Sequence, residues 1–142
     1  MSFDVDLQPS EVYEVSLLPS YTYTDMIRDI DCITSKEQVT IDVLTYSLIG
    51  LAIPIVTITN NASDNHFKNV ILVSCRIHPG ETNASFMCRG FMKVLTSNSP
   101  HIREFLDKNI VKIVPMINPD GVVIGNFRTS KLVIIQTSWE WT

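Results

Sequence analysis

The sequence predicts an α/β fold with a βαβ unit at its centre. Two nearly unbroken apolar runs, residues 70–77 and 110–117, are typical of buried strands, and residues 82–97 between them follow helical spacing. This order predicts two parallel strands joined by a right-handed crossover. With 142 residues, of which 45% are hydrophobic and 18% charged, the chain has the size and composition of one folded domain rather than of a disordered segment.

The N-terminal part predicts shorter elements. We expect one strand over residues 12–17 and a short helix over residues 24–33. Residues 53–59 are β-branched and apolar, and a turn-rich stretch separates them from residues 70–77. These two segments are therefore expected to form a hairpin or a neighbouring pair. The second of them should be central in its sheet, with helices on both faces.

The C-terminal half predicts two helices before the last buried strand. Residues 82–97 place an apolar stripe on one helical face. Residues 99–106 begin with Ser-Pro, which is typical of a cap followed by the first residue of a helix, so a second, shorter helix is expected there. Residues 118–121, Asn-Pro-Asp-Gly, have the composition of a tight turn in which Asp120 needs only a structural role.

Charge is distributed unevenly along the chain. Residues 1–65 carry ten acids and two bases, a net charge of −8, whereas residues 66–142 carry five acids and nine bases, a net charge of +4. The nine bases are scattered and lack interleaved aromatic residues, so we expect no nucleic-acid partner. A mildly positive half favours an acidic ligand, although ordinary surface charge gives the same count.

Composition also indicates a cytoplasmic protein. The longest uncharged apolar run, residues 48–58, contains Gly50 and Pro54 and is much shorter than the ~20 residues that cross a bilayer, so we expect no membrane span. The N-terminus opens acidic and lacks the pattern of a secretory signal. The three cysteines are an odd number with no close pairing, so reduced thiols are expected, with Cys75 and Cys88 as small core residues.

Two segments leave the carboxyl ends of the two buried strands, residues 76–81 and residues 118–121. In open α/β sheets ligands bind beyond these ends, so the two segments are expected to be neighbours. His78 and Glu81 flank a Pro-Gly turn, and an imidazole and a carboxylate that converge there are two of the donors of a His₂Glu zinc site. A solvated histidine and a glutamate at a helix start, facing the helix dipole, are the alternative.

A third metal ligand is not evident near this turn. His66 precedes a strand that carries it roughly 26 Å from His78 at ~3.3 Å per residue, and His101 starts at the far end of a helix about 24 Å long. Both are expected on the surface. Arg128 follows the 118–121 turn closely enough to reach over the same crevice, where it could stabilise an oxyanion or bind a carboxylate. An exposed loop arginine is the alternative.

Three stretches resemble the cytosolic carboxypeptidases, which are zinc carboxypeptidases of peptidase family M14. They are Arg-Ile-His-Pro-Gly-Glu-Thr-Asn-Ala-Ser at 76–85, Lys-Ile-Val-Pro-Met-Ile-Asn-Pro-Asp-Gly-Val at 112–122, and Gly-Asn-Phe-Arg at 125–128. Residues 20–25 and 44–47 are similar to the stretch that joins the family's N-terminal β domain to its catalytic domain.

The resemblance implies a division of the chain into three parts. Residues 1–20 would be the last strand of the N-terminal β domain and its linker. Residues 21–130 would be the N-terminal half of the catalytic domain, with a partial mixed sheet and a βαβ core of the zinc carboxypeptidase fold. Residues 131–142 would be a divergent tail.

By the same resemblance, His78 and Glu81 bind one Zn²⁺ and Arg128 is the catalytic arginine. The implied reaction is hydrolysis of a C-terminal peptide bond, commonly of glutamates on acidic tails such as those of tubulin. Zinc polarises a water and the scissile carbonyl, a glutamate acts as general base, and an arginine steadies the oxyanion.

The sequence departs from the family after Ser130. The family continues with a Gly-Arg-Asp-Leu-Asn-Arg-like run, and its third zinc ligand and general-base glutamate come later; this chain has no counterpart of them. We therefore expect a truncated chain with an incompletely liganded zinc and no activity of its own. A non-catalytic module that binds acidic C-terminal tails is one alternative. An amidohydrolase of the aspartoacylase type, which shares an H-x-x-E pair, is another.

Overall fold

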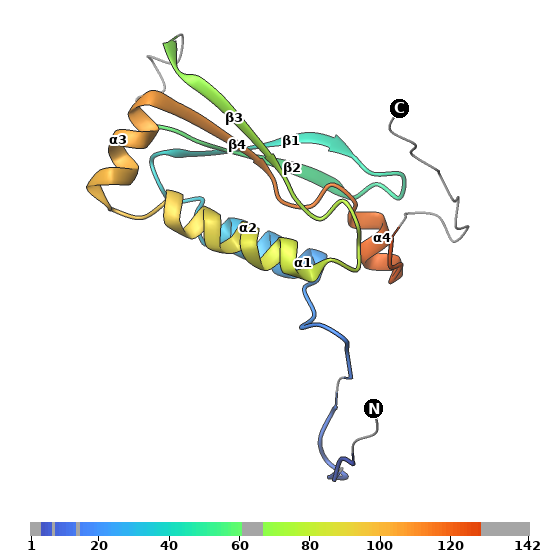
Figure 1. The fold of residues 1–142 in the computed structure, drawn as a ribbon. Helices are drawn as coiled ribbons and strands as arrows, with labels where there is room; N and C mark the ends of the chain where they lie inside the picture. The colour runs from blue at the N-terminus through green and yellow to red at the C-terminus, as the bar shows by residue number, and fades with distance from the viewer. Residues whose placement is uncertain (1–3, 7, 14, 61–66, 129–142) are drawn as a thin grey trace, which may run out of the picture.

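The computed structural model describes residues 4–6, 8–13, 15–60 and 67–128. Four strands form one sheet, and helices lie on one side of it and at its ends (Figure 1). In chain order the elements are α1 (Tyr23–Asp31), β1 (Val39–Tyr46), β2 (Ala52–Ile58), β3 (Asn69–Ser74), α2 (Thr82–Leu95), α3 (Pro100–Lys108), β4 (Asn109–Val114) and α4 (Pro119–Ile124).

The sheet is mixed and its order is β1-β2-β4-β3. β1 and β2 are antiparallel, with Val39 opposite Ile58, and β2 and β4 are also antiparallel, with Val56 opposite Ile113. β3 and β4 are parallel, and α2 and α3 connect them. The predicted α/β class, the mixed sheet and the parallel βαβ unit are confirmed.

The predicted position of β3 is wrong. β4 lies between β2 and β3, so β2 and β3 do not pair, and β3 is an edge strand of the described sheet with mostly exposed side chains. β4 has apolar residues buried on both faces and takes the central place. The apolar composition of residues 70–77 correctly indicates a strand, but it does not specify which strands lie beside it in the sheet.

Two further elements differ from the prediction. β1 was not predicted, although Val39, Ile41 and Val43 alternate with polar residues as a half-buried strand requires. The strand predicted over residues 12–17 is absent from the described part of that range, where Val12 and Leu17 are exposed. A single strand with no partner has no ladder to stabilise it, which explains its absence.

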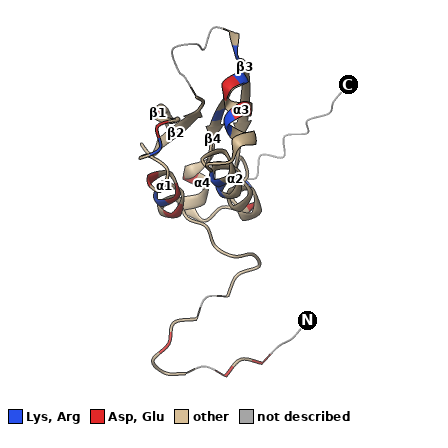
Figure 2. Cartoon of the chain, turned by 90° about the vertical axis from the view of Figure 1, so that its left-hand side faces the viewer, with Lys and Arg blue, Asp and Glu red and all other residues tan. Residues whose placement is uncertain are grey.

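α1 and α2 lie side by side against the same face of the sheet (Figures 1 and 2). α1 begins one residue before the predicted start because Thr22 and Asp25 form a capping box. The core between the helices and the sheet contains apolar side chains from both layers: Met26, Ile30, Val56, Ile58, Cys88, Met92, Leu95, Val111, Ile113 and Met116. In the described part of the chain no helix is long and apolar enough to span a membrane.

Candidate active site

The loops that follow β3 and β4 lie side by side, as predicted from the parallel pair. The amide of Cys75 donates to the carbonyl of Val114 at 2.9 Å, and the amide of Ile117 donates to the carbonyl of Cys75 at 3.0 Å. The side-chain amide of Asn118 donates to the carbonyl of Ile77 at 3.3 Å. The two segments therefore form one continuous edge beyond the carboxyl ends of the strands.

Residues 78–81, called here the His78–Glu81 turn, carry the predicted imidazole and carboxylate. The amide of Glu81 donates to the carbonyl of His78 at 3.1 Å, which closes the turn. Glu81 is the N-cap residue of α2, yet its carboxylate makes no capping hydrogen bond. The side chain of His78 is half-exposed and that of Glu81 exposed, so both are open to solvent and to a ligand.

Arg128 lies next to this turn. The amide of Gly80 donates to the carbonyl of Phe127 at 2.8 Å, and Nδ1 of His78 lies 3.3 Å from the carbonyl oxygen of Arg128. A carbonyl only accepts, so the second contact needs a proton on Nδ1 of His78. A metal ion would then meet the lone pair of Nε2, or would displace the Arg128 carbonyl from Nδ1.

The segment that carries Arg128 reaches the turn because α4 is short. The residues predicted as a tight turn, 118–121, are the cap and first turn of this helix: Asn118 accepts from the amide of Gly121 at 3.1 Å, and Pro119 is the first helical residue. Gly125 ends the helix with φ of 83°, a left-handed conformation suited to glycine. The chain then turns back toward Gly80.

Gly80 allows this close approach. A Cβ placed on Gly80 would lie 2.4 and 2.7 Å from ring carbons of Phe127 and 3.0 Å from the Phe127 carbonyl oxygen. The absence of a side chain at Gly80 is therefore what allows the segment with Arg128 to lie against the His78–Glu81 turn.

Arg76 is a residue of the site that the sequence interpretation did not single out. Its side chain is only 3% exposed, and its φ of 53° is left-handed, a conformation that costs a residue with a Cβ roughly 1–2 kcal/mol. Nε donates to the carbonyl of Pro79 at 2.8 Å, Nη1 to Oγ of Ser85 at 2.8 Å, and Nη2 to the carbonyl of Tyr21 at 3.3 Å. A charged residue directly after an apolar strand is the signal that could have identified it.

The electrostatic surroundings of Arg76 are unusual. Burial lowers the pKa of its guanidinium, while the nearby charges of Tyr21 and Glu81 act in the opposite direction. Among the described residues no carboxylate lies within ion-pair distance of it. Arg76 is therefore a buried cation stabilised by neutral hydrogen-bond acceptors.

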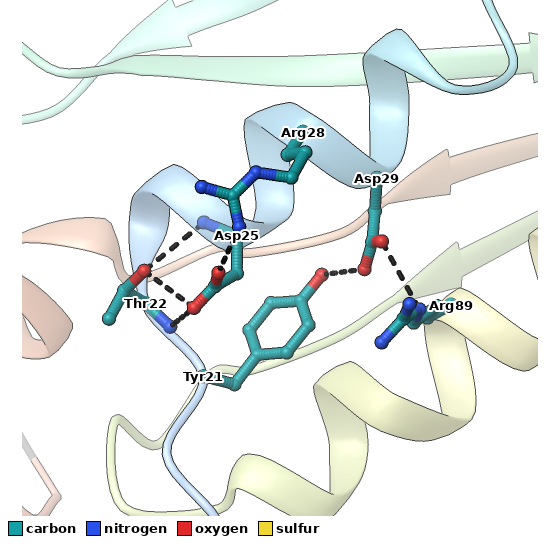
Figure 3. A network of polar contacts seen from close by, with 6 residues as sticks. All are labelled: Tyr21, Thr22, Asp25, Arg28, Asp29 and Arg89. Carbon is teal, nitrogen blue, oxygen red and sulfur yellow. Dashed lines mark hydrogen bonds and ion pairs between the residues drawn. The ribbon is translucent and has the colours of Figure 1, made fainter.

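The carbonyl of Tyr21 is held in place by contacts of the Tyr21 side chain (Figure 3). The Tyr21 hydroxyl donates to Oδ2 of Asp29 at 2.7 Å, and Nε of Arg89 lies 3.1 Å from Oδ1 of Asp29, so one carboxylate links α1 to α2. The ring packs edge-on against Phe86 with centroids 5.3 Å apart. Burial, followed by the hydrogen bond to Asp29, raises the pKa of Tyr21.

The cysteines contribute to packing. Cys88 is buried in the core as predicted, and Cys75 is half-buried against it. The neighbouring thiol of Cys88 lowers the pKa of the Cys75 thiol below its ordinary value.

The donors present are suitable for zinc but form an incomplete set. Within the described ranges no group of three His, Cys, Asp or Glu side chains is arranged to hold a metal ion. His101 is exposed on α3, and His66 lies outside the described residues. His78 and Glu81 offer a nitrogen and an oxygen donor of the kinds that zinc binds, whereas a catalytic zinc site usually has three protein ligands.

Comparison with known proteins places the sequence in a family. The family model "Zinc carboxypeptidase" matches residues 26–132. The chain is 41% identical over 117 residues to cytosolic carboxypeptidase 2 of Xenopus tropicalis, covering 78% of the chain and 12% of that protein. It is 38% identical over 123 residues to cytosolic carboxypeptidase 1 of Mus musculus, covering 78% of the chain and 10% of that protein.

Solved structures of carboxypeptidases also resemble this fold. The crystal structure of a metallo-carboxypeptidase from Burkholderia cenocepacia superposes with a TM-score of 0.72 at 27% identity, covering 77% of the chain and 30% of that structure. The chain therefore spans about an eighth of the length of the curated relatives and under a third of this solved structure.

Proposed function

Because the chain belongs to the zinc carboxypeptidase family, we propose that His78 and Glu81 are two ligands of a catalytic zinc ion and that Arg128 is a catalytic residue of the same site. The reaction is hydrolysis of the C-terminal peptide bond of a polypeptide. The supporting observation is the pair of contacts, Gly80 to Phe127 and His78 to Arg128, that holds the imidazole and the arginine segment together.

Each of these residues has a distinct part in the proposed chemistry. Bound zinc would supply a Lewis acid that polarises water and the scissile carbonyl. Glu81 offers a carboxylate that is not engaged in capping α2, and His78 offers one ring nitrogen while the Arg128 carbonyl orients the other. The exposed guanidinium of Arg128 is a permanent cation that can stabilise negative charge developing on the carbonyl oxygen.

We further propose glutamate residues of acidic tails, such as those of tubulin, as the substrate. The net charge of +4 on residues 66–142, which include the site, favours an acidic polypeptide. We also propose a cytoplasmic location, because the matched relatives carry the name cytosolic carboxypeptidase.

The proposed domain organisation follows the family. Residues 21–130 form the N-terminal half of the catalytic domain, residues 1–20 come from a preceding β domain and linker, and residues 131–142, which lie outside the described residues, form a divergent tail. Since the described chain offers two zinc donors and no third, we propose that it binds zinc weakly and does not cleave peptides unaided.

Zinc binding by the 142-residue chain tests the site. We expect His78→Ala and Glu81→Ala each to weaken zinc affinity in a calorimetric titration, whereas His101→Ala, which removes an exposed histidine of α3, leaves it unchanged. Equal zinc affinity in wild-type and His78→Ala proteins would contradict the proposed site.

Incubation with glutamylated peptides and zinc tests the activity. Peptide binding without free glutamate agrees with the proposal for the chain alone, and it is also what a non-catalytic binding module would give. Glutamate release that depends on His78 would show that the chain cleaves unaided. Turnover of N-acyl amino acids instead of peptides would favour an aspartoacylase-type amidohydrolase.

A further inference from the structure

The peptide group between Pro79 and Gly80 lies at the centre of the His78–Glu81 turn and is held at both ends. Its carbonyl oxygen accepts from Nε of Arg76 at 2.8 Å. Its N–H donates to the carbonyl of Phe127 at 2.8 Å. The guanidinium, the peptide group and the Phe127 carbonyl thus form a chain of three hydrogen-bonding groups, in which each bond polarises the next.

Arg76 is fixed on its other side as well. Nη1 donates to Ser85 in the first turns of α2, and Nη2 donates to the carbonyl of Tyr21, which precedes α1. Ser85 is 1% exposed and Tyr21 6% exposed, so both acceptors are buried and have little freedom. The planar guanidinium therefore fixes the Pro79–Gly80 peptide group relative to α2 and to the residue that precedes α1.

A role in packing alone does not account for this arrangement. A buried cation without a partner carboxylate is costly, and an apolar side chain of similar length would fill the same space without that cost. The directed contacts of Arg76 all lead to the turn or to its supports.

We propose that Arg76 is the positioning residue of the His78–Glu81 turn: by holding the Pro79–Gly80 peptide it sets His78, Glu81 and the Arg128 segment in one geometry before a metal binds. This inference rests on the proposed function, because it assigns the turn to a metal site. Arg76 itself touches neither metal nor substrate.

The test compares variants of the 142-residue chain by two measurements. Arg76→Met keeps much of the length of the side chain and removes every donor; Arg76→Lys keeps the charge but cannot reach three acceptors. Ser85→Ala removes one acceptor and leaves Arg76 in place, which guards against a variant of Arg76 that fails to fold. Arg103→Lys is the matched control, because Arg103 is an exposed arginine of α3, away from the turn and from Tyr21.

The first measurement is hydrogen exchange of the Gly80 amide in metal-free protein, followed by NMR. We expect Arg76→Met to exchange this amide faster, Arg76→Lys and Ser85→Ala to be intermediate, and Arg103→Lys to match wild type. The second is zinc affinity, which we expect to fall about tenfold to hundredfold in Arg76→Met, the usual effect of losing a group that orients metal ligands.

Four outcomes separate the proposals. Faster exchange together with weaker zinc binding supports the positioning role. Unchanged Gly80 exchange overturns it, and faster exchange with unchanged zinc affinity also overturns it, leaving Arg76 as a structural residue. If wild type and His78→Ala bind zinc equally, the proposed function fails, and the positioning role fails with it.

Discussion

Gly80 is the residue at which the His78–Glu81 turn and the Arg128 segment come closest. Its amide donates a hydrogen bond to the Phe127 carbonyl, and a Cβ at this position would clash with both that oxygen and the Phe127 ring. A single methyl group is therefore enough to separate the two halves of the candidate site.

We expect Gly80→Ala to destabilise the protein by about 1–3 kcal/mol, the usual cost of overpacking, and to weaken zinc binding. Gly90→Ala is the matched control: Gly90 lies in α2 with no atom within 4 Å of an added Cβ, and alanine should stabilise that helix by roughly 1 kcal/mol. Urea unfolding measures both changes. A destabilisation of the same size in both variants would show that the contact with Phe127 is unimportant.

Individual residues of the site differ in how far the sequence predicts them. The sequence singles out His78 and Glu81 as candidates by their spacing at the end of an apolar strand, and Arg128 by its distance after the Asn-Pro-Asp-Gly segment. Arg76 and Gly80 are not found in this way, because their roles depend on contacts with Tyr21 and Phe127, which are remote in sequence.

At the scale of the elements, α1 illustrates how a local motif fixes a helix start. Oγ1 of Thr22 accepts from the amide of Asp25 at 3.1 Å, and the Asp25 carboxylate accepts from the amide of Thr22 at 2.9 Å (Figure 3). These bonds from the backbone and then the side chain of Thr22 lower the pKa of Asp25 below its ordinary value of 3.8.

We expect Thr22→Ala to lose about 1 kcal/mol of stability at neutral pH, whereas Thr24→Ala, in the same turn without a capping bond, should be neutral or slightly stabilising. A lowered carboxyl pKa stabilises the fold above the unfolded value and loses that contribution as pH falls through the folded value. The part of the difference between wild type and Thr22→Ala that comes from the Thr22 side chain bonding the Asp25 carboxylate should therefore disappear as pH falls below 3.8, while the loss of the capping bond to the Asp25 amide remains. Thermal unfolding as a function of pH measures this, and parallel curves would contradict it.

The helices and strands with a clear pattern in their own residues were predicted best. α2 and α3 lie where helical spacing and the Ser-Pro start placed them, because apolar stripes and caps are encoded within the segment. The order of the strands could not be predicted in this way, because it depends on pairings between distant segments. Val56 pairs with Ile113, for example, which is over 50 residues away in sequence. The same β-branched residues are compatible with several different orders of the strands in the sheet.

At the scale of the whole molecule, the edge strand β3 is a feature with consequences for solubility. Val70 is 61% and Leu72 67% exposed, and the strand has no neighbour on its outer side among the described residues. An apolar edge with unpaired backbone groups is a template for association with another strand.

We expect Leu72→Lys to reduce self-association of the chain while leaving its unfolding midpoint nearly unchanged, because a charged side chain on an edge strand opposes pairing. Ser35→Lys adds the same charge on an exposed turn after α1, away from the edge. Light scattering across a concentration series distinguishes the two. Equal effects of both variants would attribute the change to net charge instead.

The hydrogen bonds that link Tyr21 to Arg76 and His78 to Arg128 span 55 and 50 residues of the chain. Contacts of such length are slow to close, since the loop entropy is lost before the bond is gained. Because synthesis proceeds from the N-terminus, His78 is made before Arg128, and the contact between them cannot form until Arg128 has been added. The contact between His78 and Arg128 is therefore expected to form after the helices and turns on either side of it, whose own contacts are local in sequence.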